Sequence, residues 1–462
     1  MPQPAGKAEA TATEVPGSRR RLLSGRGLIN VLRRPYTIAF LWLAAIVHIA
    51  GLLAQLPGRV GRFDFSVFYA SALAMRRGLN PYVTDLSRIG DPLGLEIHPL
   101  IHTTSTPTFL LLFASFAQLS EPTCYWIWFA INVAALGATM VLLIGGTELD
   151  SWLKSVLAVM MLLYTPLGDQ IAYAQAQILI LLMLVLMMRW LARGHDARAG
   201  LVLALAAALR AFPAVLALYL LMRRRWRALI FTVAGSIVIG LITIAGIGWP
   251  LTLSGLMTIA GVGGPRTLGL LDSTTLSLSR HSTAEPINVA LSAFITRLFW
   301  DSFGIGLSRR LDLLRLATVA CAQLAILWLS IKATWRSLPL DELDCAFGLW
   351  VVTAIILSPV AWIHYMVLLF IPFTQIAVAV YRGRCGTGVL WMALASYYLL
   401  PVSVVLRDPA ARWGGLILYR VVGEGAFLSL ILAYAAAYRL TVEAGRNQVL
   451  PRLRTETATA AI

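Results

Sequence analysis

Three side chains in this sequence have the type and the setting for acid–base or phosphate chemistry. Asp64 is a lone carboxylate among aromatic residues in "GRFDFSVFYASALAMRRGLNPYV", which directly follows a long apolar run. Arg210 lies in the middle of the apolar run "LALAAALRAFPAVLALYLL", and His364 lies within "SPVAWIHYMVLLFIP". A carboxylate can take a proton from an attacking hydroxyl, and a guanidinium or an imidazole can stabilise a phosphate. The three types are those needed to activate a hydroxyl and to bind a phosphate.

Two interpretations of Asp64 are open. The apolar spacing after it predicts a helix over 65–77, and Gly78 follows directly, as helix ends prefer. Asp64 would then be the N-cap, which stabilises a helix by roughly 1 kcal/mol. Alternatively, it is a general base at the membrane surface. The two roles are compatible, although hydrogen bonds to the ionised carboxylate would lower its basicity.

Arg210 is costly in an apolar run and therefore indicates function. A charge at the bilayer centre costs at least ~2.5 kcal/mol on insertion scales. Pro213 predicts that the helix is kinked or broken near the arginine, which would bring the guanidinium to a hydrated cavity. A phosphate is the natural partner, because a guanidinium binds it through two parallel hydrogen bonds. The structural alternative is a pair with an aspartate or a carbonyl of another helix.

The remaining candidates have weaker patterns. His364 could donate to a leaving phosphate or to a sugar hydroxyl, or it could be a polar residue satisfied near the membrane interface. Gln175 and Gln177 could bind sugar hydroxyls or only bond a neighbouring helix. Asn288 and Arg297 share one face of a helix expected over 287–300, and that face could line a site or be solvated.

No metal is expected from the sequence. His98 and His102 have helical spacing, but a proline follows the first and no third ligand is adjacent. The four cysteines lie far apart and show no CxxC spacing. We therefore expect neither a metal nor another cofactor.

The composition is that of a polytopic membrane protein. The 462 residues are 58% hydrophobic and 13% charged, whereas a soluble protein would have about a quarter charged residues. The net charge of +16 is concentrated in the two tails and in short connections such as "RRRWR" and "YRGRCG". This is the distribution of cytoplasmic loops, with membrane lipids as neighbours, and it does not indicate nucleic acid.

Apolar segments predict an all-α bundle of about twelve transmembrane helices. The segments are 36–57, 106–119, 125–145, 152–167, 171–191, 199–222, 229–247, 311–334, 346–357, 362–380, 389–406 and 415–438. An even number places both basic tails on the cytoplasmic side and the first long loop outside. The connection 189–198 fits this rule less well, so either it faces out or a segment before it is re-entrant.

The chain divides into one membrane domain with two tails. We expect a disordered basic cytoplasmic tail over 1–35, an integral membrane domain over 36–438 and a cytoplasmic tail over 439–462. The apolar run after the first tail is too long for a signal peptide and is expected to be a retained anchor.

In this order, the fragments resemble glycosyltransferase family 87, the polyprenyl-phosphate-mannose-dependent α-mannosyltransferases of the GT-C class. The resemblance covers nearly all of 36–438 and rests on "DFSVFYASALAMRRGLNPY", "YAQAQILILLMLVLMM", "AGLVLALAAALRAFPAVLALYLLMRRRW", "INVALSAFITRL" and "SPVAWIHYMVLLFIP". Members of this family often have glycine where this chain has Ala174, and asparagine where it has Gln177.

The resemblance implies a GT-C-type bundle with an amphipathic helix in the first outer loop and a set of site residues. Asp64 would be the base, and Arg210, His364 and Arg297 would bind the donor phosphate. The other substrate-binding residues would be Tyr69, Asn80, Tyr82, Gln175, Gln177, Asn288 and Trp362.

The implied reaction transfers a hexose, mannose, from a polyprenyl-phosphate donor to a lipid or glycan acceptor, with inversion and without a metal. The implied place is the outer face of a bacterial inner membrane. Two alternatives are a transporter or flippase of a lipid-linked sugar and an envelope polysaccharide polymerase. Against the transporter, no expected span carries a mid-membrane acid for ion coupling, and no inverted repeat is evident.

Overall fold

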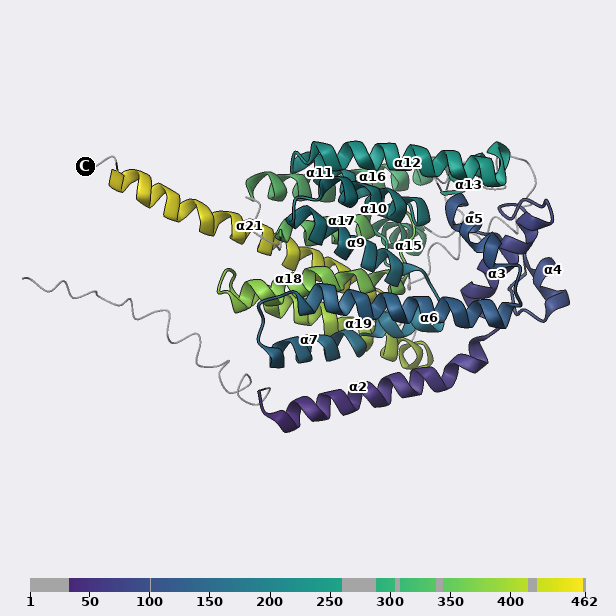
Figure 1. The fold of residues 1–462 in the computed structure, drawn as a ribbon, viewed down its shortest axis with the longest axis horizontal. Coiled ribbons are helices and arrows are strands. Elements are labelled where there is room, and N and C mark those ends of the chain that lie inside the picture. Colours follow the sequence, from purple (N-terminus) through teal and green to yellow (C-terminus); the bar gives the residue numbers. More distant parts are fainter. Residues whose placement is uncertain are drawn as a thin grey trace, which may run out of the picture.

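The computed structural model describes residues 33–99, 101–259, 288–303, 308–337, 344–413 and 422–459, so all but the last three residues of the tail expected over 1–35 lie outside these ranges. The described part is a bundle of helices whose long members share one direction (Figure 1). It has isolated β-bridges but no strand within these ranges. The elements are α2 (Pro35–Gln55), η1 (Leu56–Arg59), α3 (Phe63–Arg76), α4 (Ser87–Gly90), η2 (Asp91–Leu93), α5 (Pro107–Phe116), α6 (Glu121–Met140), η3 (Val141–Gly145), α7 (Ser151–Leu162), α8 (Thr165–Ala172), α9 (Gln177–Ala192), α10 (Asp196–Leu209), η4 (Phe212–Val215), α11 (Leu216–Met222), α12 (Trp226–Ile247), α13 (Trp249–Ile259), α15 (Leu291–Phe303), α16 (Arg309–Arg336), α17 (Cys345–Leu357), η5 (Ile363–Leu369), α18 (Phe370–Tyr381), α19 (Thr387–Trp413) and α21 (Gly425–Thr459).

The length and apolar composition of these helices indicate a membrane-embedded protein. Among the described residues, 7 helices are long and apolar enough to cross, or 8 if α7 and α8, bent by 49°, form one span. Several other apolar helices are shorter, such as α5 with 10 residues. At a rise of 1.5 Å per residue, α5 covers about 15 Å, half of the hydrocarbon core. An all-α polytopic protein is thus confirmed, whereas a total of about twelve spans stays a prediction.

One expected crossing, over 199–222, is wrong because the chain turns back. Helix α10 runs alongside α12 in the same direction, and Arg225 before α12 pairs with Asp196 at the start of α10 at 3.4 Å. The chain therefore returns to its starting side through η4 and α11, which pack against α17. We call α10, η4 and α11 the hairpin. An apolar run of this length looks like a span in sequence, but the contacts of its ends show that it is re-entrant.

An ion pair fixes the open end of the hairpin. The guanidinium of Arg223, just after α11, donates to Asp344 Oδ1 at 2.6 Å and to the Ser337 carbonyl at 2.6 Å. The Tyr219 hydroxyl also donates to Asp344, at 3.1 Å. Both side chains of the ion pair are largely buried. The hairpin is therefore tied to the connection between α16 and α17.

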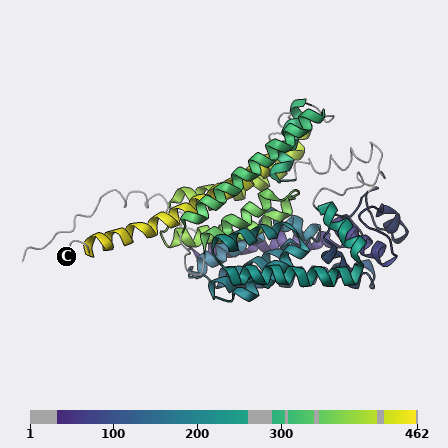
Figure 2. The same ribbon diagram turned by 90° about the horizontal axis from the view of Figure 1, so that it is seen from above.

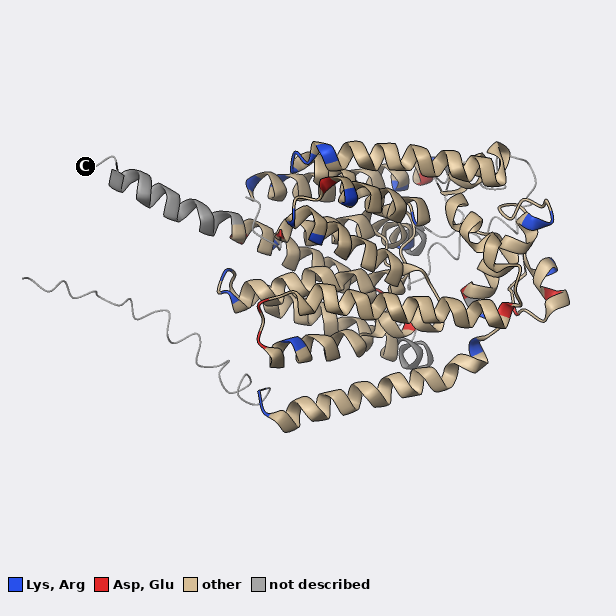
Figure 3. Cartoon of the chain, in the orientation of Figure 1, with Lys and Arg blue, Asp and Glu red and all other residues tan. Residues whose placement is uncertain are grey.

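The two ends of the bundle differ in charge. Arg33 before α2 pairs with Asp150, Arg189 bonds the Gly146 carbonyl, and the Gly386 amide donates to Glu443 in α21. These contacts place the start of α2 and the far part of α21 at one end, which we call the terminal end. Basic residues predominate there, with acidic residues among them, whereas neither sign predominates at the end that holds α3 and α4, the loop end (Figure 3). The connection 189–198 therefore lies at the terminal end, and a re-entrant segment follows it.

Helix α3 in the first loop begins earlier than expected. It covers Phe63–Arg76 rather than 65–77, so Asp64 lies in its first turn. The N-cap is Arg62, which makes no side-chain capping bond. The interpretation of Asp64 as the N-cap is therefore wrong. The end agrees with the expectation, since Arg76 is in the last turn and Gly78 has a φ of +73°.

The helices before and after 260–287 form two adjoining groups. Figure 2 shows the purple-to-teal elements on one side and the green-to-yellow elements on the other. Helix α17 packs against the hairpin of the first group and against α18 and α21 of its own. Residues from both groups can therefore meet near α17.

Candidate functional site

Asp64, Gln175 and Arg210 form a hydrogen-bonded relay. The Gln175 side-chain amide Nε2 donates to Asp64 Oδ2. Nη2 of Arg210 donates to Gln175 Oε1 at 2.9 Å. These residues come from α3, from the turn between α8 and α9, and from the tip of the hairpin, so three parts of the chain build one site.

The backbone at Arg210 breaks the helix, as Pro213 predicts. Arg210 follows α10 with φ −145° and ψ 127°, an extended conformation, and η4 begins two residues later. The Thr106 hydroxyl donates to the Leu209 carbonyl at 3.0 Å, which satisfies one carbonyl that the break frees. The extended residue directs the Arg210 side chain out of the helix line and toward α3.

Two aromatic rings hold the Arg210 guanidinium. Its carbon lies 5.7 Å from the ring centre of Phe68 and 5.5 Å from that of Phe109. Within the described part of the chain, no carboxylate oxygen lies within 4.0 Å of this guanidinium. The positive charge is thus stabilised by ring faces and an amide oxygen but not neutralised. Such a group can bind an anion.

The turn between α8 and α9 fixes Gln175. Ala174 has a φ of +49°, a left-handed conformation that costs a residue with a Cβ roughly 1–2 kcal/mol. The Trp128 indole donates to the Ala174 carbonyl at 2.7 Å, and the Gln170 amide donates to the Gln175 carbonyl. These bonds hold the strained turn. The conformation also explains why glycine would suit position 174.

Gln177 lies next to this relay without a bond of its own. Its side chain is fully buried, and neither Nε2 nor Oε1 has a hydrogen-bond partner among the described residues. A buried amide without a partner costs about 1–3 kcal/mol. Gln177 is therefore a group that a bound polar molecule could satisfy.

His364 joins the site from the second group of helices. It lies in the first turn of η5, its side chain is buried, and its Nε2 has no hydrogen-bond partner in the described part of the chain. Its ring centre lies 6.5 Å from that of Tyr173 in the α8–α9 turn. The Arg210 charge acts on both the Asp64 carboxyl and the His364 imidazole. The structure thus joins Asp64 and Arg210 through Gln175 and places His364 beside Tyr173 of the turn that carries Gln175.

The site is recessed from the loop end. Trp128, which holds the α8–α9 turn, lies seven residues into α6, whose first residue is Glu121. Seven residues correspond to about 10 Å along a helix. Glu121 itself accepts a hydrogen bond from the Gly61 amide at 3.1 Å, just before α3. Gln175 and its turn therefore lie deeper in the bundle than the Gly61–Glu121 contact at the loop end.

Burial dominates the electrostatics of the acid. It raises the pKa of Asp64 above the ordinary value of 3.8, while the Gln175 hydrogen bond and the Arg210 charge act in the opposite direction. Burial penalises the charged form, so the carboxyl holds its proton more tightly than in water. A carboxylate of raised pKa is a stronger base once ionised.

Arg297 and Asn288 are engaged elsewhere in the protein. Two nitrogens of Arg297 bond the Glu424 carboxylate at 2.6 and 2.7 Å, and a third bonds the Asn288 carbonyl at 3.0 Å. The Asn288 side chain accepts from the Ala361 amide at 3.0 Å, and its backbone forms a bridge with Trp362. Asn288 therefore fixes the segment directly before His364, whereas Arg297 is not brought to the relay.

Three further predicted residues bond within the loop end. The Tyr69 hydroxyl donates to the Leu119 carbonyl at 2.8 Å, and the Tyr82 hydroxyl donates to the Ser105 carbonyl at 3.0 Å. The Asn80 side chain donates to Ser254 Oγ in α13 at 3.1 Å. These bonds shape the loop around the site, and none of them involves Asp64, Gln175 or Arg210.

Several residues that contact the relay are not predicted from the sequence. Phe68 and Phe109 hold Arg210, and Gln170 and Trp128 hold Gln175. Phe68 could have been found, because it lies four residues after Asp64 and therefore on the same face of α3. The other three carry no local signal, since aromatic residues and glutamines in apolar helices are common.

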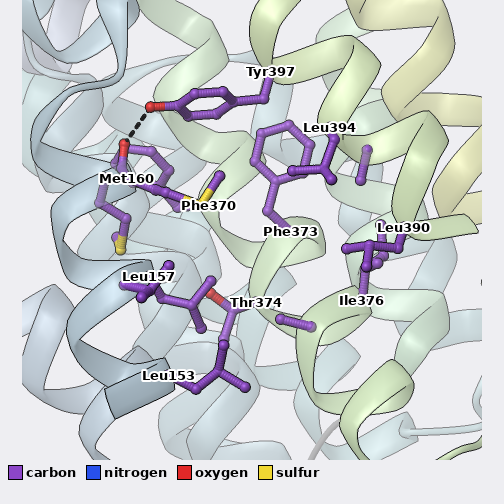
Figure 4. A pocket seen from close by; sticks show the side chains of 14 residues that line it. Leu153, Leu157, Met160, Phe370, Phe373, Thr374, Ile376, Leu390, Leu394 and Tyr397 are labelled. Carbon is purple, nitrogen blue, oxygen red and sulfur yellow. Dashed lines mark hydrogen bonds between the residues drawn. The ribbon is translucent and has the colours of Figure 1, made fainter. Parts of the chain in front are cut away.

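A separate cavity lies between α7, α18 and α19 (Figure 4). Apolar side chains such as Leu157, Phe373 and Leu390 line it, and the Tyr397 hydroxyl at its rim donates to the Met160 carbonyl at 2.8 Å. None of Asp64, Gln175, Arg210 and His364 lines it. In the part of the chain that the structure describes, no cluster of three or more His, Cys, Asp or Glu could hold a metal.

Comparison with known proteins gives one match. The sequence model of glycosyltransferase family 87 matches residues 104–359, which is more than half of the chain. No curated protein and no solved structure matches significantly. The matched range contains Gln175 and Arg210, whereas Asp64 and His364 lie on either side of it.

Proposed function

Because the chain belongs to glycosyltransferase family 87 and is a membrane glycosyltransferase, we propose that it transfers mannose from a polyprenyl-phosphate donor to a hydroxyl group of a lipid or glycan acceptor. The family match favours neither of the two alternatives, a lipid-linked sugar transporter or a polysaccharide polymerase. The partners are then a lipid-linked sugar, its acceptor and the surrounding membrane lipids.

One observation carries this proposal: a half-buried cation, with no carboxylate within 4.0 Å among the described residues, lies one amide away from a half-buried acid. Arg210 and Asp64 occupy the two sides of the Gln175 side chain. A guanidinium that the protein leaves unneutralised suits a phosphate, and a carboxylate of raised pKa suits the removal of a proton. A sugar attached to a phosphate, and the hydroxyl that attacks the sugar, need these two groups close together.

The proposed reaction is a single displacement. The acceptor hydroxyl oxygen attacks the anomeric carbon and forms the new glycosidic bond, while its proton moves to Asp64. The bond from the anomeric carbon to the phosphate oxygen breaks, and its electron pair stays on the polyprenyl phosphate. Attack opposite to the leaving group inverts the anomeric centre.

Arg210 and His364 stabilise the leaving phosphate in this scheme. Negative charge grows on the phosphate oxygens as the bond breaks, and fixed donors in a water-poor site lower the energy of that state most. Arg210 contributes a full positive charge, and we assign to His364 a ring N–H that is donated to the same anion. Gln177, whose amide has no protein partner, binds a hydroxyl of the sugar.

The membrane setting supports a lipid-linked donor. The relay is recessed within apolar helices, and the described chain has no sheet of the kind that binds sugar nucleotides. The concentration of basic residues at the terminal end supports a cytoplasmic position for both termini. The site near the loop end then faces the periplasmic or extracellular side of a bacterial plasma membrane.

The test is transfer by purified protein in lipid nanodiscs. The assay combines radiolabelled polyprenyl-phosphate-mannose with a total lipid extract of the encoding organism as acceptor. Asp64→Asn is expected to lower the transfer rate by a factor of about 10² to 10⁴, as removal of a general base does. Arg210→Ala is expected to lower it by about 10² to 10³, as loss of a charge-stabilising donor does.

Asp91→Asn is the matched control, because Asp91 is an exposed acid of the same loop. This variant should transfer at the parent rate. Full activity of Asp64→Asn would remove the base assignment. Transfer from polyprenyl-phosphate-glucose but not from the mannose donor would overturn the choice of sugar. Movement of the donor between the leaflets of sealed proteoliposomes, without transfer, would favour the transporter.

A further inference from the structure

The orientation of the Gln175 side chain is fixed by its two neighbours. An ionised carboxylate only accepts hydrogen bonds, and a guanidinium only donates them. The amide must therefore direct its NH₂ group to Asp64 and its oxygen to Arg210, as it does. A glutamate at this position could not donate when ionised, and a lysine could not accept. Gln175 is thus matched to a position between a carboxylate and a guanidinium.

Without this amide, the acid and the guanidinium would be free to pair directly. Two opposite charges in a buried site attract strongly, and an adjacent arginine lowers the pKa of an aspartate by about 1–3 units. A carboxylate in such a pair is a weaker base, and the guanidinium has fewer donors left for a ligand. Both groups would then neutralise each other instead of acting on substrate.

We propose that Gln175 is a positioning residue that holds Asp64 and Arg210 apart and keeps each available to a different substrate. Asp64 Oδ1 remains for the acceptor hydroxyl, because the amide bonds Oδ2. The other guanidinium nitrogens of Arg210 remain for the donor phosphate, because the amide takes a bond from one nitrogen. This inference rests on the proposed function, since it assigns the two ends of Gln175 to acceptor and donor.

The surroundings of Gln175 suit a fixed separator. Its backbone amide donates to the Gln170 carbonyl at 3.1 Å, and the Gln170 side chain returns a bond to the Gln175 carbonyl. The strained Ala174 and its bond from Trp128 fix the preceding residue. The aromatic faces of Phe68 and Phe109 restrict Arg210 on the other side. The amide therefore cannot easily move aside.

Few charged or titratable groups face the acid from the surrounding elements. Of the described residues, Arg210 from the hairpin is the charged group that acts on Asp64. Glu121 of α6 acts on Tyr69 of α3 and bonds the Gly61 amide instead. The positive charge of Arg210 also acts on the His364 imidazole of η5.

Asp169 of α8 is a second acid near the turn that carries Gln175, and Arg59 is the charged group that acts on it. The acid limb of the pH–rate profile is therefore assigned to the Asp64–Arg210 pair by comparison with Asp169→Asn, which should leave it in place.

Two variants, the apolar Gln175→Leu and the isosteric Gln175→Glu, test the separator in opposite directions. Gln175→Leu removes both hydrogen bonds. Loss of the bond to the carboxylate alone would move the acid limb of kcat/KM for polyprenyl-phosphate-mannose to higher pH, whereas direct pairing of Asp64 with Arg210 moves it to lower pH; because the separator role predicts pairing, we expect the shift to lower pH. Gln175→Glu places a second carboxylate beside Asp64, so the acid limb should move to higher pH by about one unit or more. In both variants kcat should fall at least about tenfold, because donors for the phosphate are lost.

Gln55→Glu is the matched control, since Gln55 is an exposed glutamine at the end of α2. It introduces the same charge and should leave the acid limb in place. If both Gln175 variants keep the parent acid limb, or if both move it in one direction, the separator role is overturned. Asp64→Asn distinguishes this failure from failure of the proposed function: an active Asp64→Asn removes the base itself, whereas an inactive one leaves only the separator refuted.

Discussion

At the residue scale, Arg210 illustrates how a charge can be held in an apolar bundle without an acid. Placing it near the bilayer centre costs at least ~2.5 kcal/mol. A hydrogen bond to a charged group returns about 1.5–3 kcal/mol, and each ring face adds about 0.5–2 kcal/mol. Phe68, Phe109 and Gln175 therefore offset the cost without neutralising the charge.

The pH dependence of transfer follows from the setting of Asp64. A general base works only when ionised, and burial raises the pKa of this carboxyl above 3.8. Activity should therefore be present above the raised pKa and should fall tenfold per pH unit below it. The measurement is kcat/KM for the mannose donor across a pH series, with protein folding checked at each pH. An acid limb at or below pH 3.8 would contradict a buried base.

The sequence was enough to single out candidate site residues but not to predict which other residues they contact. The anomaly of Asp64 and Arg210 among apolar residues was visible in the sequence, as was the helix break at Pro213. The position of Gln175 between them was not, because its partners lie 111 and 35 residues away along the chain. Arg297 looked equally anomalous in sequence, yet it forms an ion pair with Glu424, 127 residues away.

At the element scale, close approach of α10 and α12 sets the position of Arg210. A Cβ at Gly200 of α10 would lie 2.1 Å from the Ala228 carbonyl oxygen of α12. This atom belongs to the backbone, so a side chain there would push the helices apart. Small residues at such contacts allow membrane helices to pack closely.

Gly200→Ala should therefore destabilise the protein, by roughly 1–3 kcal/mol as overpacking does. Gly240→Ala in α12 is the control, because nothing lies within 4 Å of a Cβ there. Alanine is favoured over glycine in a helix by about 1 kcal/mol, so the control should be unchanged or more stable. Thermal unfolding in detergent compares the two. Equal midpoints for both variants would contradict the close contact.

The sequence could not predict the direction of the hairpin. Its length and hydropathy are those of one crossing helix, and the information that it returns lies in pairs distant in sequence, such as Arg223 with Asp344. The break was predictable because proline acts locally. The start of α3 was misplaced by two residues for a related reason: Asp64 resembles a cap locally, but its side chain bonds Gln175 instead.

At the scale of the whole molecule, the charge difference between the two ends predicts its orientation. Contacts place the start of α2, the connection 189–198 and Glu443 at the terminal end, where basic residues predominate. The positive-inside rule then puts this end in the cytoplasm and the relay near the opposite face.

Cysteine labelling in intact cells checks this orientation. Arg88→Cys lies at the loop end, where the side chain of Arg88 is 82% exposed, and it should react with a membrane-impermeant maleimide. Arg193→Cys lies in an exposed position at the terminal end and should react only after permeabilisation. Labelling is counted above that of the parent chain, which has four cysteines of its own. The reverse pattern would place the relay in the cytoplasm.

The hairpin also has a consequence for how the protein is made. Ribosomes deliver a chain from its N-terminus, so α10, η4 and α11 emerge long before Asp344, which is 121 residues after Arg223. During that interval the insertion machinery holds a segment that starts and stops on the same side of the membrane, with Arg210 at its tip. Helix α10 can pack on α9 and α12 as soon as these emerge, but η4 and α11 gain their contacts with α17 only when α17 arrives, so the tip that carries Arg210 is completed late in biogenesis.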